Sequence, residues 1–270
     1  MERNLLIIGE RINSTRKGIQ EALQKRDEAF ITEEVKAQIE GGAHVIDLNA
    51  ATLMEGEIEC LKWLVPLVQE VADVPICLDS PNPKAMEEIL PLCEKKPIVN
   101  SITGESERYE SLIPIIKEHK PKVIALTIDD SGMPSTAEDR VRIATDLIQK
   151  LTADGVSIED IYVDPVVTPV STDVSSGKAV LDAIETIMEK FPGVHTVCGL
   201  SNVSFGLPKR KQINQIFLVL ALSKGLDAVI LDPCDKRMMA NLITTLMLLG
   251  EDEFCMNYIN ACNEGKIEVA

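Results

Sequence analysis

Strand-like and helix-like segments alternate along the whole sequence, and this alternation restricts the possible folds more than any other feature. Eight short apolar runs, rich in β-branched residues, are typical of buried parallel strands. Each is followed by a segment in which apolar residues recur at helical spacing. The predicted strands cover residues 5–13, 44–49, 75–80, 97–102, 122–128, 161–167, 195–200 and 227–232. The predicted helices cover residues 17–25, 29–40, 57–72, a segment from Pro83, 105–118, 136–154, 177–190, a segment around 213–221, 236–249 and a short helix within 251–270.

Repeated βα units of this kind predict an α/β fold with a parallel sheet covered by helices. At 270 residues, we expect the sheet to close into a (β/α)8 TIM barrel that forms a single domain over residues 1–270. An open, doubly wound sheet is the structural alternative. The first βα turn, Gly9–Ser14, lacks the G-x-G-x-x-G pattern of dinucleotide-binding sheets, which favours the barrel.

The charge of the chain excludes several classes of partner. A formal net charge of −16 is unfavourable for binding nucleic acid, which requires clustered Lys and Arg, and for binding anionic membrane surfaces. No apolar run approaches the roughly 18 residues that span a bilayer. The first residues, Met1–Asn4, lead directly into an apolar strand and do not resemble a signal peptide.

The cysteines and histidines indicate a reducing compartment and no metal site. Seven cysteines show no C-x-x-C pair, and this odd, unpatterned set is typical of a cytoplasmic protein. The three histidines, His44, His119 and His195, lie beside no carboxylate pair that would suit a metal ion. We therefore expect a cytoplasmic protein that binds no metal itself.

Polar side chains end almost every predicted strand. In a (β/α)8 barrel the active site lies at these carboxyl ends. A single Asp or Ser there is more simply read as a helix cap, but the complete set is harder to explain in that way. The set comprises Glu10, Arg11, Asn13, Asp47, Asn49, Asp79, Ser80, Asn100, Ser101, Thr127, Asp129, Asp164, Ser201, Asn202, Asp232 and Asp235.

This set of side chains favours binding of a heterocycle over nucleophilic catalysis. No base stands beside a Ser or Cys, so no catalytic triad is expected. Clustered carboxylates could hold a hard cation. The mixture of Asp with Asn also suits a fused heterocycle, because a carboxylate accepts two N–H bonds from an amidine-like edge while amides bind carbonyl and ring nitrogen atoms.

Six motifs, one per strand and in the same order, resemble those of the methyltetrahydrofolate:corrinoid protein methyltransferases, a family of pterin-binding barrels. The resemblance covers essentially the whole chain, and its specificity lies in the ordered set. The motifs are Gly9–Asn13, Asp47–Asn49, Leu78–Ser80, Asn100–Ser101, Asp164–Pro165 and Gly199–Ser204.

The resemblance implies a role for each matching residue. Asn202 matches the amide that approaches N5 of the pterin, the atom that carries the methyl group, and is the expected catalytic residue. An amide there can stabilise a charge or a proton at N5 without holding a competing charge. Asp79, Asn100 and Asp164 match residues that bind the pterin ring, and Arg210 matches a basic residue near the site. Asp47 and Ser201 match positions behind these residues.

The resemblance also implies the substrates and partners. Tetrahydrofolate or 5-methyltetrahydrofolate is the expected substrate. The cobalamin is expected on a separate corrinoid protein, because this chain lacks the D-x-H-x-x-G pattern that is typical of corrinoid-binding domains. A homodimer is expected from the family. The loop Phe205–Pro208 departs from the more polar loop of acetogen enzymes, which favours transfer from the methylcorrinoid to tetrahydrofolate over the reverse.

Two other functions remain open from the sequence. Dihydropteroate synthases use a similar barrel, but their seventh strand resembles Ser-Arg-Lys, whereas this chain has Ser201–Val203 with Asn202 in the middle. A non-catalytic folate-binding subunit would bind the pterin without methyl transfer, and the presence of Asn202 speaks against it.

Overall fold

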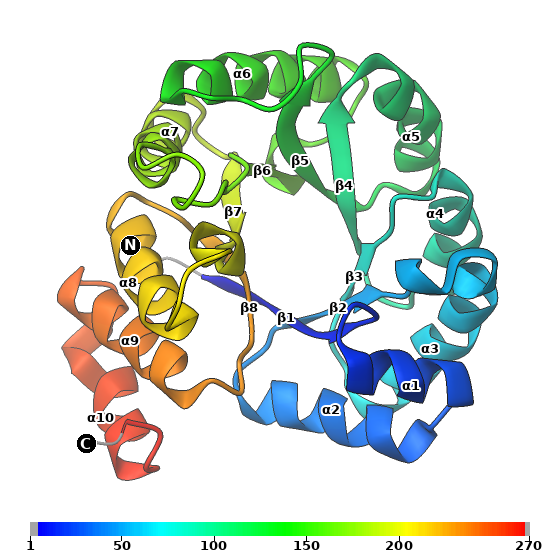
Figure 1. Cartoon of the computed structure of the whole chain (residues 1–270), viewed down its shortest axis with the longest axis horizontal. Helices are drawn as coiled ribbons and strands as arrows, with labels where there is room; N and C mark the ends of the chain where they lie inside the picture. The colour runs from blue at the N-terminus through cyan, green and yellow to red at the C-terminus, as the bar shows by residue number, and fades with distance from the viewer. Residues whose placement is uncertain (1–4, 268–270) are drawn as a thin grey trace.

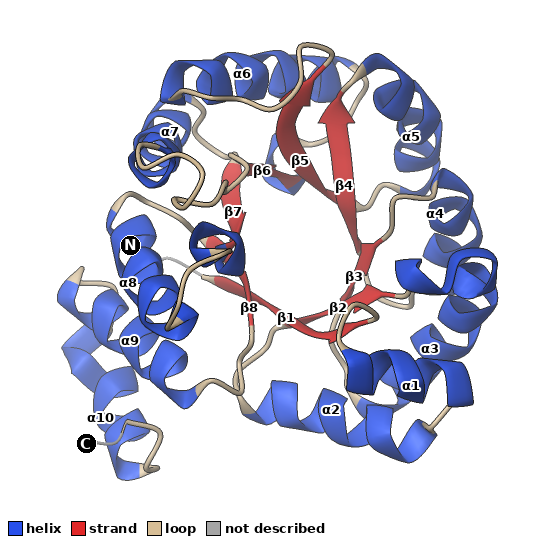
Figure 2. Ribbon diagram, in the orientation of Figure 1, coloured by secondary structure: helices blue, strands red, loops and turns tan. Residues whose placement is uncertain are grey.

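The computed structural model describes residues 5–267, and it confirms the predicted (β/α)8 barrel. Within this range, eight parallel strands close into a barrel in sequence order, with helices around the outside (Figure 1). Figure 2 shows the strands as a central ring and the helices as the outer layer. The strands are β1 (Leu6–Asn13), β2 (Val45–Asn49), β3 (Ile76–Asp79), β4 (Ile98–Gly104), β5 (Lys122–Asp129), β6 (Ile161–Asp164), β7 (His195–Gly199) and β8 (Ala228–Leu231).

The helices of the described chain agree closely with the sequence pattern. Most begin after the carboxyl end of a strand, and several begin at side-chain caps: Asp27, Asn82, Thr136 and Asp235 each accept a hydrogen bond from a backbone N–H of the first turn. The α-helices are α1 (Lys17–Lys25), α2 (Glu28–Glu40), α3 (Glu57–Val71), α4 (Pro83–Ile89), α5 (Ser106–His119), α6 (Ala137–Ala153), α7 (Ser176–Lys190), α8 (Arg210–Ser223), α9 (Lys236–Leu248) and α10 (Met256–Asn263).

Strand six is shorter than predicted from the sequence. The expected strand ran to Val167, but β6 ends at Asp164. Pro165 has no N–H to donate to a neighbouring strand, and Val166 takes a left-handed conformation with φ of 58°. The chain therefore leaves the barrel directly after Asp164, and residues 165–175 form the loop before α7.

Strand seven also ends earlier than its apolar pattern suggested. β7 stops at Gly199, and Leu200–Ser204 form a short 3-10 helix, η4, before the loop that leads to α8. Ser201 and Asn202 thus lie just beyond the end of the strand. The final short helix of the prediction is α10, whereas residues 1–4 and 268–270 lie outside the described part of the chain. None of the helices in residues 5–267 is long and apolar enough to cross a membrane.

The interior of the barrel changes from apolar to polar along the strands. One inward residue of each strand forms an apolar layer, consisting of Ile8, Val45, Cys77, Ile98, Ile124, Tyr162, Val197 and Ala228. Side chains alternate along a strand, so the residue two positions later in each strand also points inward. These next positions are Glu10, Asp47, Asp79, Asn100, Leu126, Asp164, Gly199 and Ile230. The barrel therefore has an apolar floor and a polar layer at its carboxyl-end mouth.

Candidate functional site

The polar layer, defined as Glu10, Asp47, Asp79, Asn100 and Asp164, comes from five different strands. The register of the sheet aligns its members. Asp79 of β3 pairs with Asn100 of β4, and Asp164 of β6 pairs with Leu126 of β5. The apolar floor beneath these residues supports them on rigid strands. The three residues predicted to bind the pterin ring, Asp79, Asn100 and Asp164, thus line one end of the barrel.

Four side chains of β2, β3 and β4 form a hydrogen-bonded cluster. The Asn49 amide nitrogen Nδ2 donates to Asp79 Oδ2 at 2.8 Å, and the Asn100 Nδ2 donates to Asp47 Oδ1 at 3.5 Å. Ser14 Oγ donates to Asn49 Oδ1 at 2.9 Å, which fixes the orientation of the amide. Asp79 Oδ1 accepts no hydrogen bond from the described residues, so this oxygen atom is available to a ligand.

Burial raises the pKa of both carboxyl groups in this cluster. Asp47 lies deeper, and burial together with the nearby Asp79 charge raises its pKa well above its ordinary range. Burial also raises the pKa of Asp79, which the Asn49 amide partly offsets. Because two buried carboxylates side by side do not both ionise readily, we assign the proton of this pair to Asp47. Asp79, nearer the mouth, then presents the negative charge.

Because Asp47 is buried, we expect Asp47→Asn to be more stable than wild type, by an amount that grows with pH. An unfolded chain releases this proton above about pH 4, whereas the folded protein retains it. Wild-type stability therefore falls as pH rises from the ordinary pKa toward the raised one. The amide keeps the acceptor for Asn100 and removes this effect. We expect a melting temperature a few degrees above wild type at pH 8 and a smaller difference at pH 5, measured by calorimetry. An equal difference at both pH values would contradict the assignment.

Asp164 is held by its own loop on the opposite side of the barrel. Its Oδ1 accepts a hydrogen bond from the Val166 N–H at 2.8 Å. Burial raises the pKa of Asp164 to about 6, and the backbone hydrogen bonds and Arg140 partly oppose this rise. No hydrogen bond joins Asp164 to the Asp47–Asp79 cluster in residues 5–267, so a ligand between the two groups would connect them.

Arg140 of α6 fixes the loop that follows Asp164. Its side chain is fully buried, and Nε donates to the Pro165 carbonyl at 2.7 Å while Nη2 donates to the Val166 carbonyl at 3.2 Å. Arg140 was not predicted from the sequence, because an arginine on a helix is normally a surface residue. Its role depends on a contact that only the folded chain makes.

Replacing Arg140 by methionine is expected to destabilise the protein by about 3 kcal/mol, because the buried Pro165 carbonyl and the partly buried Val166 carbonyl lose their donor. Arg142→Met on the same helix is the matched control. Arg142 is half exposed and pairs with Asp129 at 2.9 Å, a surface contact worth less than about 1 kcal/mol. Urea unfolding of both variants measures the difference. Equal losses would show that the carbonyl contacts of Arg140 contribute little.

The turn η4 carries Ser201 and Asn202 on the rim of the mouth. Arg210 of α8 binds this turn: Nη2 donates to the Ser201 carbonyl at 2.7 Å, and Nε donates to Ser204 Oγ at 3.0 Å. Its guanidinium also lies 5.7 Å from the centre of the Phe205 ring. Asn202 is exposed, and its side-chain amide makes no hydrogen bond to any described residue. Asn202 is therefore free to bind a ligand.

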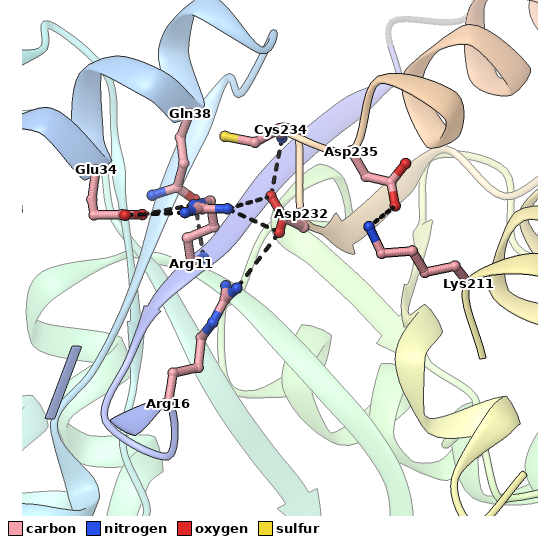
Figure 3. Close-up of polar contacts among 8 residues, drawn as sticks. All are labelled: Arg11, Arg16, Glu34, Gln38, Lys211, Asp232, Cys234 and Asp235. Carbon is pink, nitrogen blue, oxygen red and sulfur yellow. Dashed lines mark hydrogen bonds and ion pairs between the residues drawn. The ribbon is translucent and has the colours of Figure 1, made fainter. Parts of the chain in front are cut away.

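The β1–β8 side of the mouth contains a network of charges. Arg11 Nη1 lies 3.1 Å from Asp232 Oδ2, and its Nε donates to Glu34 Oε2 at 2.7 Å (Figure 3). Arg16 lies 3.7 Å from the same Asp232 oxygen. A cavity of about 350 Å³ lies beside this network, and Glu10, Ser201 and Arg210 contribute to its lining.

Several predicted strand-end residues lie outside the polar layer, and Asn13 and Ser80 make hydrogen bonds with Thr15 and Glu57 instead. Asp129 accepts hydrogen bonds from Ser131 and Arg142 at the outer end of β5, so its role is structural. Thr127 follows the inward-facing Leu126 on β5, so its side chain points away from the barrel interior. Conversely, Asn49 joins the cluster although it was only one of many strand-end residues in the sequence. No group of three or more His, Cys, Asp or Glu in residues 5–267 is arranged to hold a metal ion.

Sequence comparison identifies similar proteins over nearly the whole chain. Residues 9–232 match the family described as pterin binding enzyme. The chain is 38% identical over 265 residues to a methylcorrinoid:tetrahydrofolate methyltransferase of Eubacterium limosum, covering 97% of this chain and 98% of that protein. It is 32% identical over 240 residues to the methionine synthase of Mycobacterium leprae, covering 84% of this chain but only 20% of that protein.

Solved structures with the same fold are more distant in sequence. A dihydropteroate synthase from Clostridium difficile, crystallised with pteroic acid, superposes with a TM-score of 0.70 at 18% identity, covering 92% of this chain and 97% of that one. The Coxiella burnetii dihydropteroate synthase superposes with a TM-score of 0.69 at 14% identity, covering 91% and 94% of the two chains. At such low identity, these matches show the shared barrel fold.

Proposed function

This chain belongs to the family of pterin-binding enzymes, and we propose that it transfers a methyl group between the cobalt of a corrinoid and N5 of tetrahydrofolate. The observation that carries the proposal is the polar layer with the free Asn202 beside it. The near full-length similarity to a methylcorrinoid:tetrahydrofolate methyltransferase supports the reaction, and that relative's name supports the direction from methylcorrinoid to tetrahydrofolate.

The polar layer fits the hydrogen-bonding edge of a pterin. Asp79 has an oxygen atom without a donor, and a carboxylate at this position accepts N–H bonds from the amino group and ring nitrogen of the pterin. Asn100 and Asp164, from β4 and β6, offer further donors and acceptors around the ring. Asp47 and Ser201 support this arrangement, because Asp47 binds the Asn100 amide and Ser201 binds Arg210.

In the proposed reaction, Asn202 acts at N5. During methyl transfer to tetrahydrofolate, N5 attacks the methyl carbon and develops positive charge. The Asn202 carbonyl oxygen can accept the N5–H hydrogen bond and stabilise that charge. In the reverse direction, the amide N–H can donate to N5 as it leaves. Arg210 keeps the turn of Asn202 in place through Ser201, and rigid placement of the reacting atoms supplies much of the rate.

The rim of the mouth suits a docking partner that carries the corrinoid. Four loops that follow β2, β5, β6 and β7 each expose one apolar side chain: Met54 is 77% exposed, Met133 58%, Val174 92% and Phe205 64%. All four follow the carboxyl ends of strands and so lie at the mouth end of the barrel, and exposed apolar side chains are common at protein interfaces. We propose that a separate corrinoid protein docks on these four residues, so that the cobalt faces Asn202.

Three further expectations belong to this proposal. All seven cysteines have free thiols, which supports a cytoplasmic protein. Residues 1–270 are proposed to act as one pterin-binding domain, with no resident metal. A homodimer is expected from the family, and sedimentation of the purified protein would measure it.

The proposal is tested against its two rivals in parallel reactions. One reaction contains the protein, methylcobalamin and tetrahydrofolate; the other contains p-aminobenzoate and the dihydropterin pyrophosphate used by dihydropteroate synthases. Formation of 5-methyltetrahydrofolate in the first reaction alone is the expected result. Dihydropteroate in the second reaction would contradict it, and tetrahydrofolate binding by calorimetry without any product would indicate a non-catalytic subunit.

A further inference from the structure

Glu10 occupies a position between the two halves of the proposed site. It lies at the inward position of β1 directly above Ile8 of the apolar floor. It is close enough to Asp47 of β2 to raise the pKa of that group. On its other side it lines the same cavity as Ser201 and Arg210. Glu10 therefore lies between the cluster that binds the ring and the turn that carries Asn202.

The Glu10 carboxylate has no structural partner of its own. It makes no hydrogen bond to any residue in the range 5–267, whereas its neighbour Arg11 is fully engaged with Glu34 and Asp232. Asp232, Asp235, Arg16 and Lys211 line the same cavity as Glu10. Figure 3 shows that these charges pair with other residues: Asp232 with Arg11 and Arg16, and Asp235 with Lys211. A half-buried carboxylate at an inward strand position, with no hydrogen-bond partner in residues 5–267, calls for a reason beyond folding.

The methyl transfer itself leaves one proton without an acceptor. When N5 of tetrahydrofolate takes the methyl group, its lone pair forms the new N–C bond, and the electron pair of the broken cobalt–carbon bond stays on cobalt, giving Co(I). N5 must then lose its proton to become the neutral product. Asn202 can bind this proton but cannot keep it, because an amide is a very weak base. A nearby carboxylate is a stronger base and can take up this proton.

We propose that Glu10 is the proton acceptor that receives the N5 proton, directly or through water in the cavity beside Ser201, and that it returns a proton to N5 in the reverse reaction. This inference rests on the proposed methyl transfer. The cavity of about 350 Å³ is large enough for a short chain of water molecules, each of which takes about 30 Å³. The proton then passes from Glu10 to solvent.

The surroundings of Glu10 suit a group that gains and loses a proton near neutral pH. Burial raises the pKa of Glu10 to about 7, the charge of Asp232, which directly follows β8, adds to the rise, and Arg16 and Arg210 oppose it. Asp47 faces it from β2, and Lys211 and Asp235 line the same cavity. A general base performs best when its pKa is close to the working pH.

The test is the pH dependence of kcat in both directions, with free methylcobalamin and cob(I)alamin as the corrinoids. For methylation of tetrahydrofolate, wild-type kcat is expected to rise with pH and level off above about pH 7, because the ionised Glu10 accepts the proton. For the reverse reaction kcat is expected to fall over the same range. Glu10→Gln is expected to lower kcat about 10²-fold and to abolish both pH dependences. Glu21→Gln, an exposed glutamate on α1, is the matched control.

The outcomes separate this inference from the proposed function. Tetrahydrofolate binding by Glu10→Gln should stay within a few-fold of wild type, and Glu10→Asp should restore a pH-dependent rate. A Glu10→Gln rate equal to wild type would overturn the inference, as would a lower rate with an unchanged pH profile, since that indicates a structural role. Wild-type protein that binds tetrahydrofolate but transfers no methyl group would instead overturn the proposed function.

Discussion

Asn202→Ala is expected to lower the rate of methyl transfer by about 10²- to 10³-fold while leaving tetrahydrofolate affinity within a few-fold of wild type. The amide is exposed on η4 and contributes no hydrogen bond to the described fold, so its removal leaves the barrel and the polar layer intact. Loss of one positioned hydrogen-bonding group at a developing charge typically costs this much in kcat. Steady-state kinetics with methylcobalamin, together with calorimetry for tetrahydrofolate, separates the two effects.

Asn260→Ala is the matched control for this variant. Asn260 is also an exposed asparagine, but it lies on α10, outside the helical ring of the barrel (Figure 1). We expect its rate and affinity to equal those of wild type. If Asn202→Ala keeps full turnover, Asn202 has no part in the reaction, and a parallel loss of tetrahydrofolate binding would place its role in binding rather than in methyl transfer.

Asp79→Asn is expected to weaken tetrahydrofolate binding about 100-fold. The substitution keeps the size of the side chain and an acceptor for the Asn49 amide, which donates to Asp79 at 2.8 Å. It removes the charge and replaces one acceptor oxygen with an N–H group that opposes the N–H groups of the pterin. Hydrogen bonds to a charged group contribute about 1.5–3 kcal/mol, and a 100-fold change in Kd corresponds to about 2.7 kcal/mol.

Asp129→Asn is a closely matched control, because Asp129 also ends a barrel strand. Its carboxylate pairs with Arg142 outside the polar layer, so tetrahydrofolate affinity should not change. Calorimetric titration of both variants at one pH measures the contrast. Equal affinities for Asp79→Asn and wild type would contradict the placement of the pterin over β3.

The sequence pattern predicted the barrel because each strand repeats one local rule. A strand that is buried on both faces is a continuous apolar run, and a segment with apolar residues at helical spacing follows it. This rule predicted all eight strands of the barrel from the sequence. Asp79, Asn100 and Asp164 were singled out from the sequence as polar residues near strand ends, and the structure places them at inward positions of β3, β4 and β6, while their role in pterin binding stays a prediction. The family resemblance added the predicted role of Asn202, which composition alone does not indicate.

Other features depend on contacts between distant segments and left no local signal. Arg140 can be buried because its guanidinium donates hydrogen bonds to the carbonyls of Pro165 and Val166, which lie about 25 residues away in the sequence. The environment of Glu10 arises from β2, β8 and α8, so the sequence showed only one strand-end carboxylate among many. The early end of β6 follows from the left-handed Val166, whose apolar side chain had suggested a longer strand.

The most direct test of the central claim is methyl transfer followed by cobalamin absorbance in both directions. One cuvette contains the wild-type protein with methylcobalamin and tetrahydrofolate, and the other contains cob(I)alamin and 5-methyltetrahydrofolate. We predict turnover in both, faster in the first, with each rate reduced in Asn202→Ala. Absence of turnover in both cuvettes, together with no binding of tetrahydrofolate by calorimetry, would contradict the assignment of the polar layer as a pterin site.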